Sequence, residues 1–255
     1  MTTAHVVYPS LAGRVVLVTG GGSGIGAAMV EGFARQKSNV AFVDIDEAAS
    51  AHVRATVAVL GAQCHFEACD LRDIAALRRA IENVRRALGP ITVLVNNAAR
   101  DDRHVTEAVT PEYWDERFAV NLRHHFFAAQ AVLPDMKAAG GGAIINFGSI
   151  SWMVGLGGMV AYTAAKSAVL GLTRSLARDF GPYNVRVNAI APGAILTERQ
   201  RKLWLTPEGH ARLIEAQCLK RDLGADDVTR VVLFLASDEA GAITGQHYVV
   251  DGGRV

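Results

Sequence analysis

The sequence predicts an α/β protein built on a doubly wound, mostly parallel sheet of seven strands with helices on both faces. Short, nearly continuous apolar runs alternate with longer segments of helical periodicity from one end of the chain to the other. Apolar runs of this kind indicate strands that are buried on both faces, as in a parallel sheet. Strict alternation of strands and helices implies right-handed crossovers, which place helices on both sides of the sheet.

The expected elements follow this alternation in order. The first strand contains Val-Val-Leu-Val, the fourth Val-Leu-Val and the fifth Ala-Ile-Ile-Asn, runs too apolar for a strand with one face in water. Strands are expected at Val15–Thr19, Val40–Asp44, Gln63–Cys69, Thr92–Asn96, Ala143–Phe147, Val185–Ile190 and His247–Val250. Between them, apolar residues at helical spacing predict helices at Gly24–Gln36, Glu47–Leu60, Ile74–Leu88, Pro111–Ala138, Ala161–Phe180 and Asp226–Ala236.

The domain organisation is expected to be simple. The chain has no Ser/Pro-rich linker, no low-complexity block and no internal repeat, which favours one domain over residues 1–255. The stretch Thr197 to Leu219 departs from the alternation, because it is helical in pattern and directly follows a strand. It carries Trp204 and Pro207, and we expect a substrate lid at about 197–219.

Composition excludes several classes of partner. The 255 residues include 26 Lys and Arg against 25 Asp and Glu, so no strong field favours nucleic acid or a membrane surface. No run of about 18 apolar residues predicts a membrane span, and the first twenty residues do not have the pattern of a signal peptide. Three irregularly spaced cysteines indicate reduced thiols and a cytoplasmic protein. Cys64 and Cys69 bracket His65, but the remaining ligands of a metal site are missing, so no metal is expected.

A glycine-rich turn follows the first strand directly. Thr19 to Gly26 reads Thr-Gly-Gly-Gly-Ser-Gly-Ile-Gly and opens a helix. Glycines permit a tight turn and let the backbone approach a pyrophosphate, which then lies at the positive end of the helix. An ordinary loop between strand and helix is the alternative, but the preceding strand and the following helix favour a Rossmann-type dinucleotide site.

An acidic residue at the end of the second strand indicates which dinucleotide binds. Asp44 can accept hydrogen bonds from the adenosine ribose hydroxyls, and its charge would repel the 2′-phosphate of NADP. No Lys or Arg stands in the glycine turn or immediately after Asp44 to offset that charge. The sequence therefore predicts NAD as the cofactor.

With these residues in place, the chain resembles the short-chain dehydrogenase/reductase family over Leu11 to Gly253. The motifs that carry the resemblance are the glycine turn, Cys69-Asp70-Leu71, Asn96-Asn97-Ala98, Val120-Asn121-Leu122, Ser149, the Tyr-x-x-x-Lys of Tyr162 and Lys166, and Pro192-Gly193. The resemblance and the glycine turn together imply that NAD contacts Gly20, Ser23, Gly24, Ile25, Gly26, Asp44, Ile45, Asp70, Leu71, Asn97, Ala98, Tyr162, Lys166, Pro192, Gly193, Ile195 and Thr197. In the family pattern Asn-Asn-Ala is usually followed by Gly, whereas this chain has Ala99, which costs little only where φ is ordinary.

The resemblance also implies the catalytic residues, namely Asn121, Ser149, Tyr162 and Lys166. Tyr162 and Lys166 lie four positions apart in an expected helix and therefore share one face. A phenol has an ordinary pKa of about 10, and we expect the Lys166 ammonium and an oxidised nicotinamide to lower it enough for Tyr162 to act as acid and base. By resemblance, Ser149 holds the substrate oxygen and Asn121 holds a water that links Lys166 to solvent. Each residue alone has an ordinary structural interpretation, and the set at family spacing favours catalysis.

Local strings point to a substrate class. Segments such as Asn96 to His104, Tyr113 to Arg117, Ile145 to Trp152, Thr206 to Gly209 and Ala216 to Lys220 resemble the bacterial aldose 1-dehydrogenase branch, which includes D-xylose dehydrogenases. The resemblance implies oxidation of the anomeric hydroxyl of a sugar to a lactone. The candidate substrate residues, which follow the fourth and fifth strands or accompany the catalytic tyrosine, are Asp101, Asp102, Ser149, Ser151, Trp152 and Tyr162.

Two other functions remain open at this point. A reductase of 3-oxoacyl or other carbonyl substrates is the first, although Asp44 disfavours the NADPH that biosynthetic reduction usually uses. A non-catalytic NAD-binding sensor is the second, although a sensor has no need of the full catalytic set. Asp102 and Arg103 could also simply pair with each other on the surface. By resemblance the protein is expected to be a homotetramer, built through the long helices and the C-terminal strand.

Overall fold

The structure is a computed structural model and describes residues 6–255. Seven strands form one sheet in the order β3-β2-β1-β4-β5-β6-β7, and every neighbouring pair is parallel. The strands are β1 (Val15–Thr19), β2 (Asn39–Asp44), β3 (Cys64–Ala68), β4 (Ile91–Asn96), β5 (Gly142–Phe147), β6 (Val185–Pro192) and β7 (His247–Val250). The predicted doubly wound α/β class is confirmed, and the strand ends differ from the predicted ones by at most two residues.

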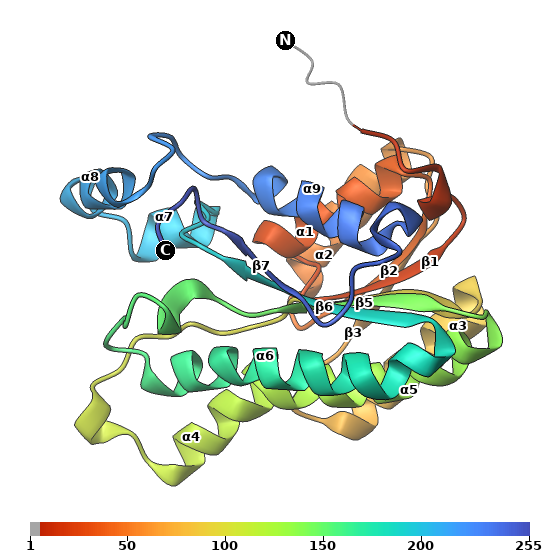
Figure 1. The fold of residues 1–255 in the computed structure, drawn as a ribbon, viewed down its shortest axis with the longest axis horizontal. Helices are drawn as coiled ribbons and strands as arrows, with labels where there is room; N and C mark the ends of the chain where they lie inside the picture. Colours follow the sequence, from red (N-terminus) through yellow and green to blue (C-terminus); the bar gives the residue numbers. More distant parts are fainter. Residues whose placement is uncertain (1–5) are drawn as a thin grey trace.

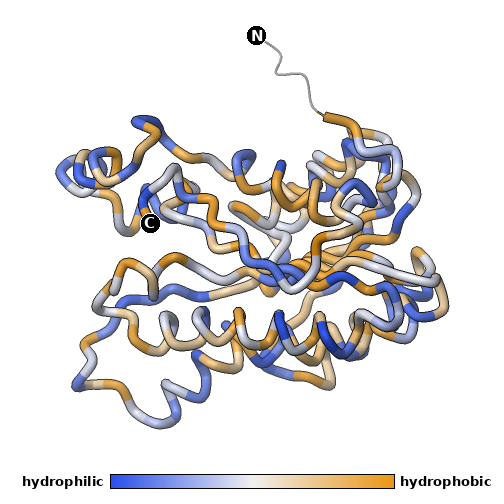
Figure 2. The backbone as a smooth tube through the Cα atoms, viewed as in Figure 1, coloured by the Kyte–Doolittle hydropathy of each residue, from blue (hydrophilic) through white to orange (hydrophobic). Residues whose placement is uncertain are grey.

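Helices cover both faces of the sheet, as Figure 1 shows. α1 (Gly24–Arg35), α2 (Glu47–Val59) and α9 (Ala225–Ala236) pack on one face. α3 (Ile74–Leu88), α5 (His124–Ala138) and α6 (Val160–Phe180) pack on the other. The apolar residues accordingly concentrate along the sheet and on the helix faces turned toward it (Figure 2).

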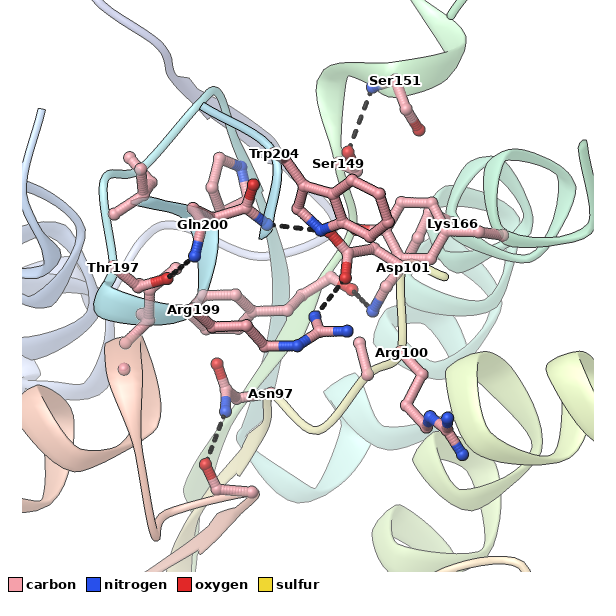
Figure 3. Close-up of a pocket in the computed structure, with 18 of the residues that line it drawn as sticks. Asn97, Arg100, Asp101, Ser149, Ser151, Lys166, Thr197, Arg199, Gln200 and Trp204 are labelled. Atoms are coloured by element: carbon pink, nitrogen blue, oxygen red, sulfur yellow. Dashed lines mark hydrogen bonds and ion pairs between the residues drawn. The ribbon is translucent and has the colours of Figure 1, made fainter. Parts of the chain in front are cut away.

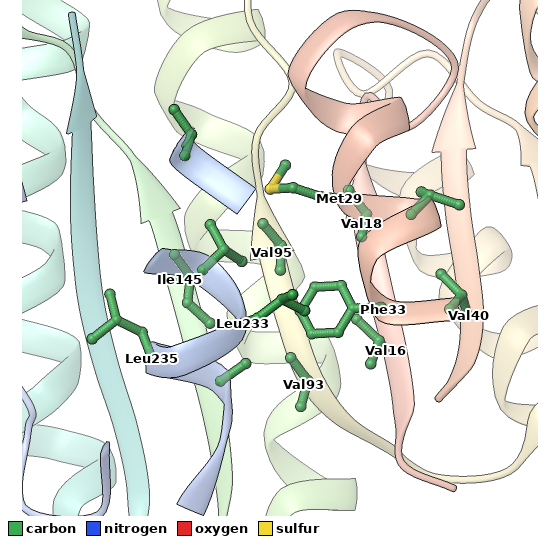
Figure 4. Packing of buried hydrophobic residues seen from close by; sticks show 14 of the residues in the cluster. Val16, Val18, Met29, Phe33, Val40, Val93, Val95, Ile145, Leu233 and Leu235 are labelled. Carbon is green, nitrogen blue, oxygen red and sulfur yellow. The ribbon is translucent and has the colours of Figure 1, made fainter. Parts of the chain in front are cut away.

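The two cores explain why the strand sequences are apolar without alternation. Successive residues of β1 point to opposite faces, so Val16 and Val18 join the core under α1 and α9. Val15 and Leu17 join the core under α3, α5 and α6. Figure 4 shows the first of these cores, in which Phe33 of α1 lies among valines of β1 and β4. A polar substitution at any of these four positions of β1 would therefore bury a polar group, whichever face of the sheet the side chain points to.

One predicted helix is interrupted. The segment Pro111–Ala138 consists of α4 (Pro111–Phe118), a π-helical turn at Ala119–Arg123 and α5. Within that turn the Asn121 amide donates to the carbonyl of Arg117, 2.9 Å away, and also reaches the loop after β4. A π-turn widens a helix locally and often occurs at functional sites, and apolar periodicity alone did not reveal it.

The strand order reverses between β1 and β4, where chain crossovers lead to opposite sides of the sheet. A crevice forms at such a switch point, at the carboxyl ends of the strands. The segment after β6 lies over this end and contains the short helices α7 (Glu198–Leu203) and α8 (Pro207–Ala216). Within residues 6–255, no helix is both long and apolar enough to cross a membrane.

Candidate active site

A cavity of about 1110 Å³ opens at the carboxyl ends of the strands, where the strand order reverses. It extends from the glycine turn, past the ends of β4, β5 and β6, to α7 and α8. The residues that the sequence predicted around NAD all line it, namely Gly20, Ser23, Gly24, Ile25, Gly26, Asp44, Ile45, Asp70, Leu71, Asn97, Ala98, Tyr162, Lys166, Pro192, Gly193, Ile195 and Thr197. The structure thus brings together residues from six separate stretches of the chain.

The glycine turn is shaped by close backbone contacts. Gly20 has a φ of +68°, and a Cβ on Gly26 would lie 1.8 Å from the carbonyl oxygen of Gly20, so no side chain fits there. The Asn97 amide donates to the carbonyls of Thr19 and Gly20, each at 3.0 Å, which locks the turn to the end of β4.

The first turn of α1 is left available to a ligand. Ser23 at its N-cap makes no capping hydrogen bond with its side chain, although the residues around it line the cavity. The N-terminal N–H groups of a helix bind anions when they lack internal partners. A cradle without Cβ atoms beside such a helix end fits a dinucleotide diphosphate.

Asp44 is held in place at the end of β2. One carboxylate oxygen accepts from the backbone N–H of Gly22 at 2.8 Å, and the other accepts from that of Asp46 at 3.0 Å. The carboxylate therefore faces the cavity in a fixed orientation, as recognition of two vicinal ribose hydroxyls requires.

An ion-pair chain at the adenine end was not predicted. Arg72 pairs with Asp70 at 2.6 Å and with Glu116 of α4 at 2.9 Å, and all three residues line the cavity. The hydrogen bond from Arg72 lowers the pKa of Asp70. No motif in the sequence relates Glu116 to this end of the site, because the pairing spans 44 positions.

Ser149, Tyr162 and Lys166 line the other end of the cavity, where Figure 3 labels Ser149 and Lys166. Ser149 follows β5, and its hydroxyl oxygen accepts from the backbone N–H of Ser151 at 3.1 Å. Tyr162 lies in the first turn of α6 and Lys166 one turn later, with the Lys166 Nζ 6.0 Å from the centre of the Tyr162 ring. Lys166 is buried and donates to the carbonyl of Phe147 at 2.6 Å.

Burial works against the charged forms of this pair. Removal from water raises the pKa of the Tyr162 phenol to about 12, and a hydrogen bond with Ser149 opposes that rise. Burial lowers the pKa of the Lys166 ammonium to about 7. The protein alone therefore keeps the phenol protonated at neutral pH, and a further positive charge is needed before it can act as a base.

Asn121 does not line the cavity, although its neighbour Val120 does. Its amide donates to the carbonyl of Arg100 at 3.1 Å and its oxygen accepts from the Arg100 N–H at 2.8 Å. The side chain thus fastens the π-turn to the loop after β4. The water that the resemblance implies at Asn121 stays a prediction, and the side-chain amide itself is engaged with the backbone of Arg100 and Arg117.

The predicted substrate residues divide into two groups. Asp101 and Ser151 line the cavity together with Ser149 and Tyr162, whereas Asp102 and Trp152 do not. Trp152 is partly exposed and lies against His247, with ring centres 6.5 Å apart, outside the residues that line the cavity.

Asp102 pairs with arginines instead of facing the cavity. Its carboxylate lies 2.6 Å from Arg117, 2.8 Å from Arg100 and 3.1 Å from Arg199. It does not pair with Arg103, whose guanidinium lies over the ring of Trp204 at 5.2 Å. Positive φ among the non-glycine residues of 6–255 occurs only at Lys37 and Asn184, so Ala99 is unstrained.

Sequence reasoning missed the cavity residues that α7 contributes. Arg199, Gln200 and Trp204 line the cavity opposite Asp101 (Figure 3). The only available signal was the helical pattern after the sixth strand, which indicated a lid but not which side chains face inward.

Comparisons with known proteins agree with this geometry. The sequence model of a family described as "Enoyl-(Acyl carrier protein) reductase" matches residues 20–254. The chain is 54% identical to the "Probable galactose dehydrogenase GalD" of Rhizobium meliloti (strain 1021), with 99% of each chain covered. It is 49% identical to the D-xylose 1-dehydrogenase of Caulobacter vibrioides (strain NA1000 / CB15N), covering 98% of this chain and 99% of that one. A 7α-hydroxysteroid dehydrogenase solved with NADH and 7-oxo glycochenodeoxycholic acid superimposes with a TM-score of 0.92 at 31% identity, covering 96% of each chain.

Proposed function

Because the chain belongs to the short-chain dehydrogenase/reductase family, we propose that it oxidises the anomeric hydroxyl of an aldose with NAD and releases the sugar lactone. One observation carries this proposal, namely the full-length similarity, at about half identity, to relatives described as galactose and D-xylose dehydrogenases. The polar lining of the cavity near Tyr162 supports it, since a sugar needs several hydrogen-bonding partners.

The proposed chemistry uses three side chains in the cavity. NAD, when bound, supplies the hydride acceptor and a positive charge on the oxidised nicotinamide. Tyr162 accepts the proton of the substrate hydroxyl at its Oη, and Ser149 fixes the substrate oxygen by a hydrogen bond. Lys166, one helical turn away, stabilises the phenolate when it carries a proton. Asn121 is a positioning residue in this scheme, because it holds the loop after β4.

A panel of aldoses tests the proposal. The purified protein is mixed with NAD and each sugar at pH 8, the formation of NADH is followed by absorbance, and the product is analysed for lactone. We expect turnover with one or a few aldoses, D-xylose and D-galactose first. Reduction of 3-oxoacyl compounds without any sugar oxidation would instead support a carbonyl reductase, to which the description of the matching family model points. No turnover with either class would support a non-catalytic NAD sensor.

The cofactor preference has its own test in Asp44→Asn. Asparagine keeps an acceptor for the N–H of Gly22 but removes the charge that repels a 2′-phosphate. A hydrogen bond to a charged group contributes about 1.5–3 kcal/mol, so kcat/KM with NAD should fall about tenfold or more while kcat/KM with NADP rises. Asp46→Asn is the matched control, since Asp46 lies just outside the cavity and caps α2. Equal ratios of NAD to NADP activity in the wild type and Asp44→Asn would refute the role of Asp44.

The assembly and location are also proposals. We propose a homotetramer formed through the long helices and β7, one of the two edge strands of the sheet. Phe126 of α5 and Val249 of β7 are both more than a third exposed, which suits an interface with another copy. Light scattering that reports a monomer would contradict this. Free thiols at Cys64, Cys69 and Cys218 support a reducing compartment such as the cytoplasm, which fractionation of the source cells would test.

A further inference from the structure

Charged and polar contacts join α7 to the loop after β4 across the mouth of the cavity. The Asp101 carboxylate binds the Arg199 guanidinium with one oxygen and accepts from the Gln200 amide at 2.8 Å with the other. Arg199 also reaches Asp102 at 3.1 Å. We call Asp101, Asp102, Arg199 and Gln200 the α7 clasp. It joins segments nearly 100 residues apart in the sequence, as Figure 3 shows for Asp101, Arg199 and Gln200.

The clasp is a large part of what holds α7 in place. Neither α7 nor α8 contains a buried residue, so apolar packing contributes little to their position. The segment is attached at its start, where Leu196 donates to the carbonyl of Leu223 at 2.9 Å. An element without a buried apolar residue opens at low free-energy cost, and the start of the segment provides a natural hinge.

The two charged clasp residues Asp101 and Arg199 line the same cavity as the Tyr162 phenol, whereas Asp102 does not. The Asp101 carboxylate raises the pKa of Tyr162, whereas Arg199 and Arg103 lower it. The other polar groups that face the phenol are Ser149 from the loop after β5 and Lys166 from its own helix. Asp101 is thus the acidic group that opposes ionisation of the phenol. Arg103 of the same loop offsets part of its charge, and the ion pair of Asp101 with Arg199 forms only while α7 lies against the loop.

We propose that Arg199 is a positioning residue whose ion pair with Asp101 couples closure of α7 to the reactivity of Tyr162. With the clasp formed, the carboxylate charge beside the phenol is cancelled and the phenol loses its proton more readily. With the clasp open, the Asp101 carboxylate has lost its Arg199 partner, and its charge in the shared cavity disfavours a second negative charge on the phenol. The base is therefore strongest when the cavity is closed over the substrate. This inference rests on the proposed role of Tyr162 but not on the identity of the substrate.

The test is the pH profile of kcat/KM for the substrate at saturating NAD, which reports the groups of the NAD-bound enzyme. Arg199→Met should move the acid limb upward by about 0.5–1 pH unit, which means a 3–10-fold loss of rate on that limb and little loss on the plateau. The double variant Asp101→Asn/Arg199→Met should bring the limb back toward its original position, because the uncompensated charge is gone.

A matched control separates charge from mobility. Arg201→Met is on the same helix and loses an ion pair with Asp222 at 3.3 Å, outside the cavity. It should leave the acid limb in place even if it loosens α7 and raises KM. An Arg199→Met profile that changes only in KM would overturn the proposal, as would a double variant that stays as displaced as the single one. The assay uses whichever sugar or carbonyl substrate the wild type turns over, so a failure of the aldose assignment is seen separately in the wild-type panel.

Discussion

Tyr162→Phe is expected to lower kcat by about 10²–10⁴-fold, the usual contribution of a positioned acid or base, while leaving the affinity for NAD close to that of the wild type. The substitution removes one oxygen and keeps the ring, so packing in the first turn of α6 is preserved. Ser149 and Lys166 remain beside the substrate, but neither replaces the phenol. The Ser149 hydroxyl is a weak base, and Lys166 is buried with its Nζ directed to the carbonyl of Phe147.

The measurement combines steady-state kinetics with NAD binding followed by calorimetry. Tyr113→Phe is the matched control, because the Tyr113 hydroxyl bonds His104 at 3.0 Å outside the cavity, and its loss should change kcat less than twofold or so. Retention of more than a tenth of the wild-type kcat in Tyr162→Phe would exclude the phenol as the essential acid and base. Loss of NAD binding in the same variant would point instead to the contact with NAD that the family resemblance implies for Tyr162.

The fold and the cofactor half of the site could be predicted because their signals are local. The valines and the leucine of β1 are buried in the cores on both faces of the sheet, and burial on both faces requires an unbroken apolar run in the sequence. The glycine turn requires glycine at position 26, because a Cβ there would lie 1.8 Å from the Gly20 carbonyl oxygen. Asp44 lies at the end of the next strand. Each of these residues is read from a short segment and needs no knowledge of distant partners.

The substrate half could not be predicted in the same way, because its geometry depends on long-range pairing. Asp101 and Asp102 are neighbours in sequence, yet one faces the cavity and the other is taken up by Arg117 of α4. Arg199 reaches both from a helix nearly 100 positions away. The pattern of apolar residues in the sequence does not indicate which of two adjacent carboxylates forms an ion pair with a given arginine. Trp152 shows the same limit, since its neighbour His247 belongs to an edge strand.

Lys166→Met is expected to abolish most turnover and also to change how the stability of the protein depends on pH. Lys166 is 1% exposed, and burial lowers the pKa of its ammonium to about 7, against about 10.4 in an unfolded chain. Between these two values the unfolded state binds more protons than the folded state. The free energy of unfolding of the wild type should therefore rise with pH through this window. Methionine is of similar length and does not titrate, so the variant lacks this contribution.

The decisive quantity is the difference in unfolding free energy between wild type and Lys166→Met, measured in urea at pH 6 and pH 9. Relative to the variant, the wild type should gain about 2–3 kcal/mol over this interval, because two of the three pH units lie above the pKa of the buried amine. Groups common to both proteins cancel in the difference. Lys202→Met, whose side chain is 71% exposed, should show no such gain. Parallel pH dependence of wild type and Lys166→Met would mean that the amine keeps its ordinary pKa, and the site would then hold a permanent ammonium beside the phenol. A gain of the expected size would mean that burial destabilises the charged form of Lys166 in the folded protein. The protein would then be less stable at neutral pH because it keeps this amine in the active site, as is expected of a buried ionisable group with a chemical role.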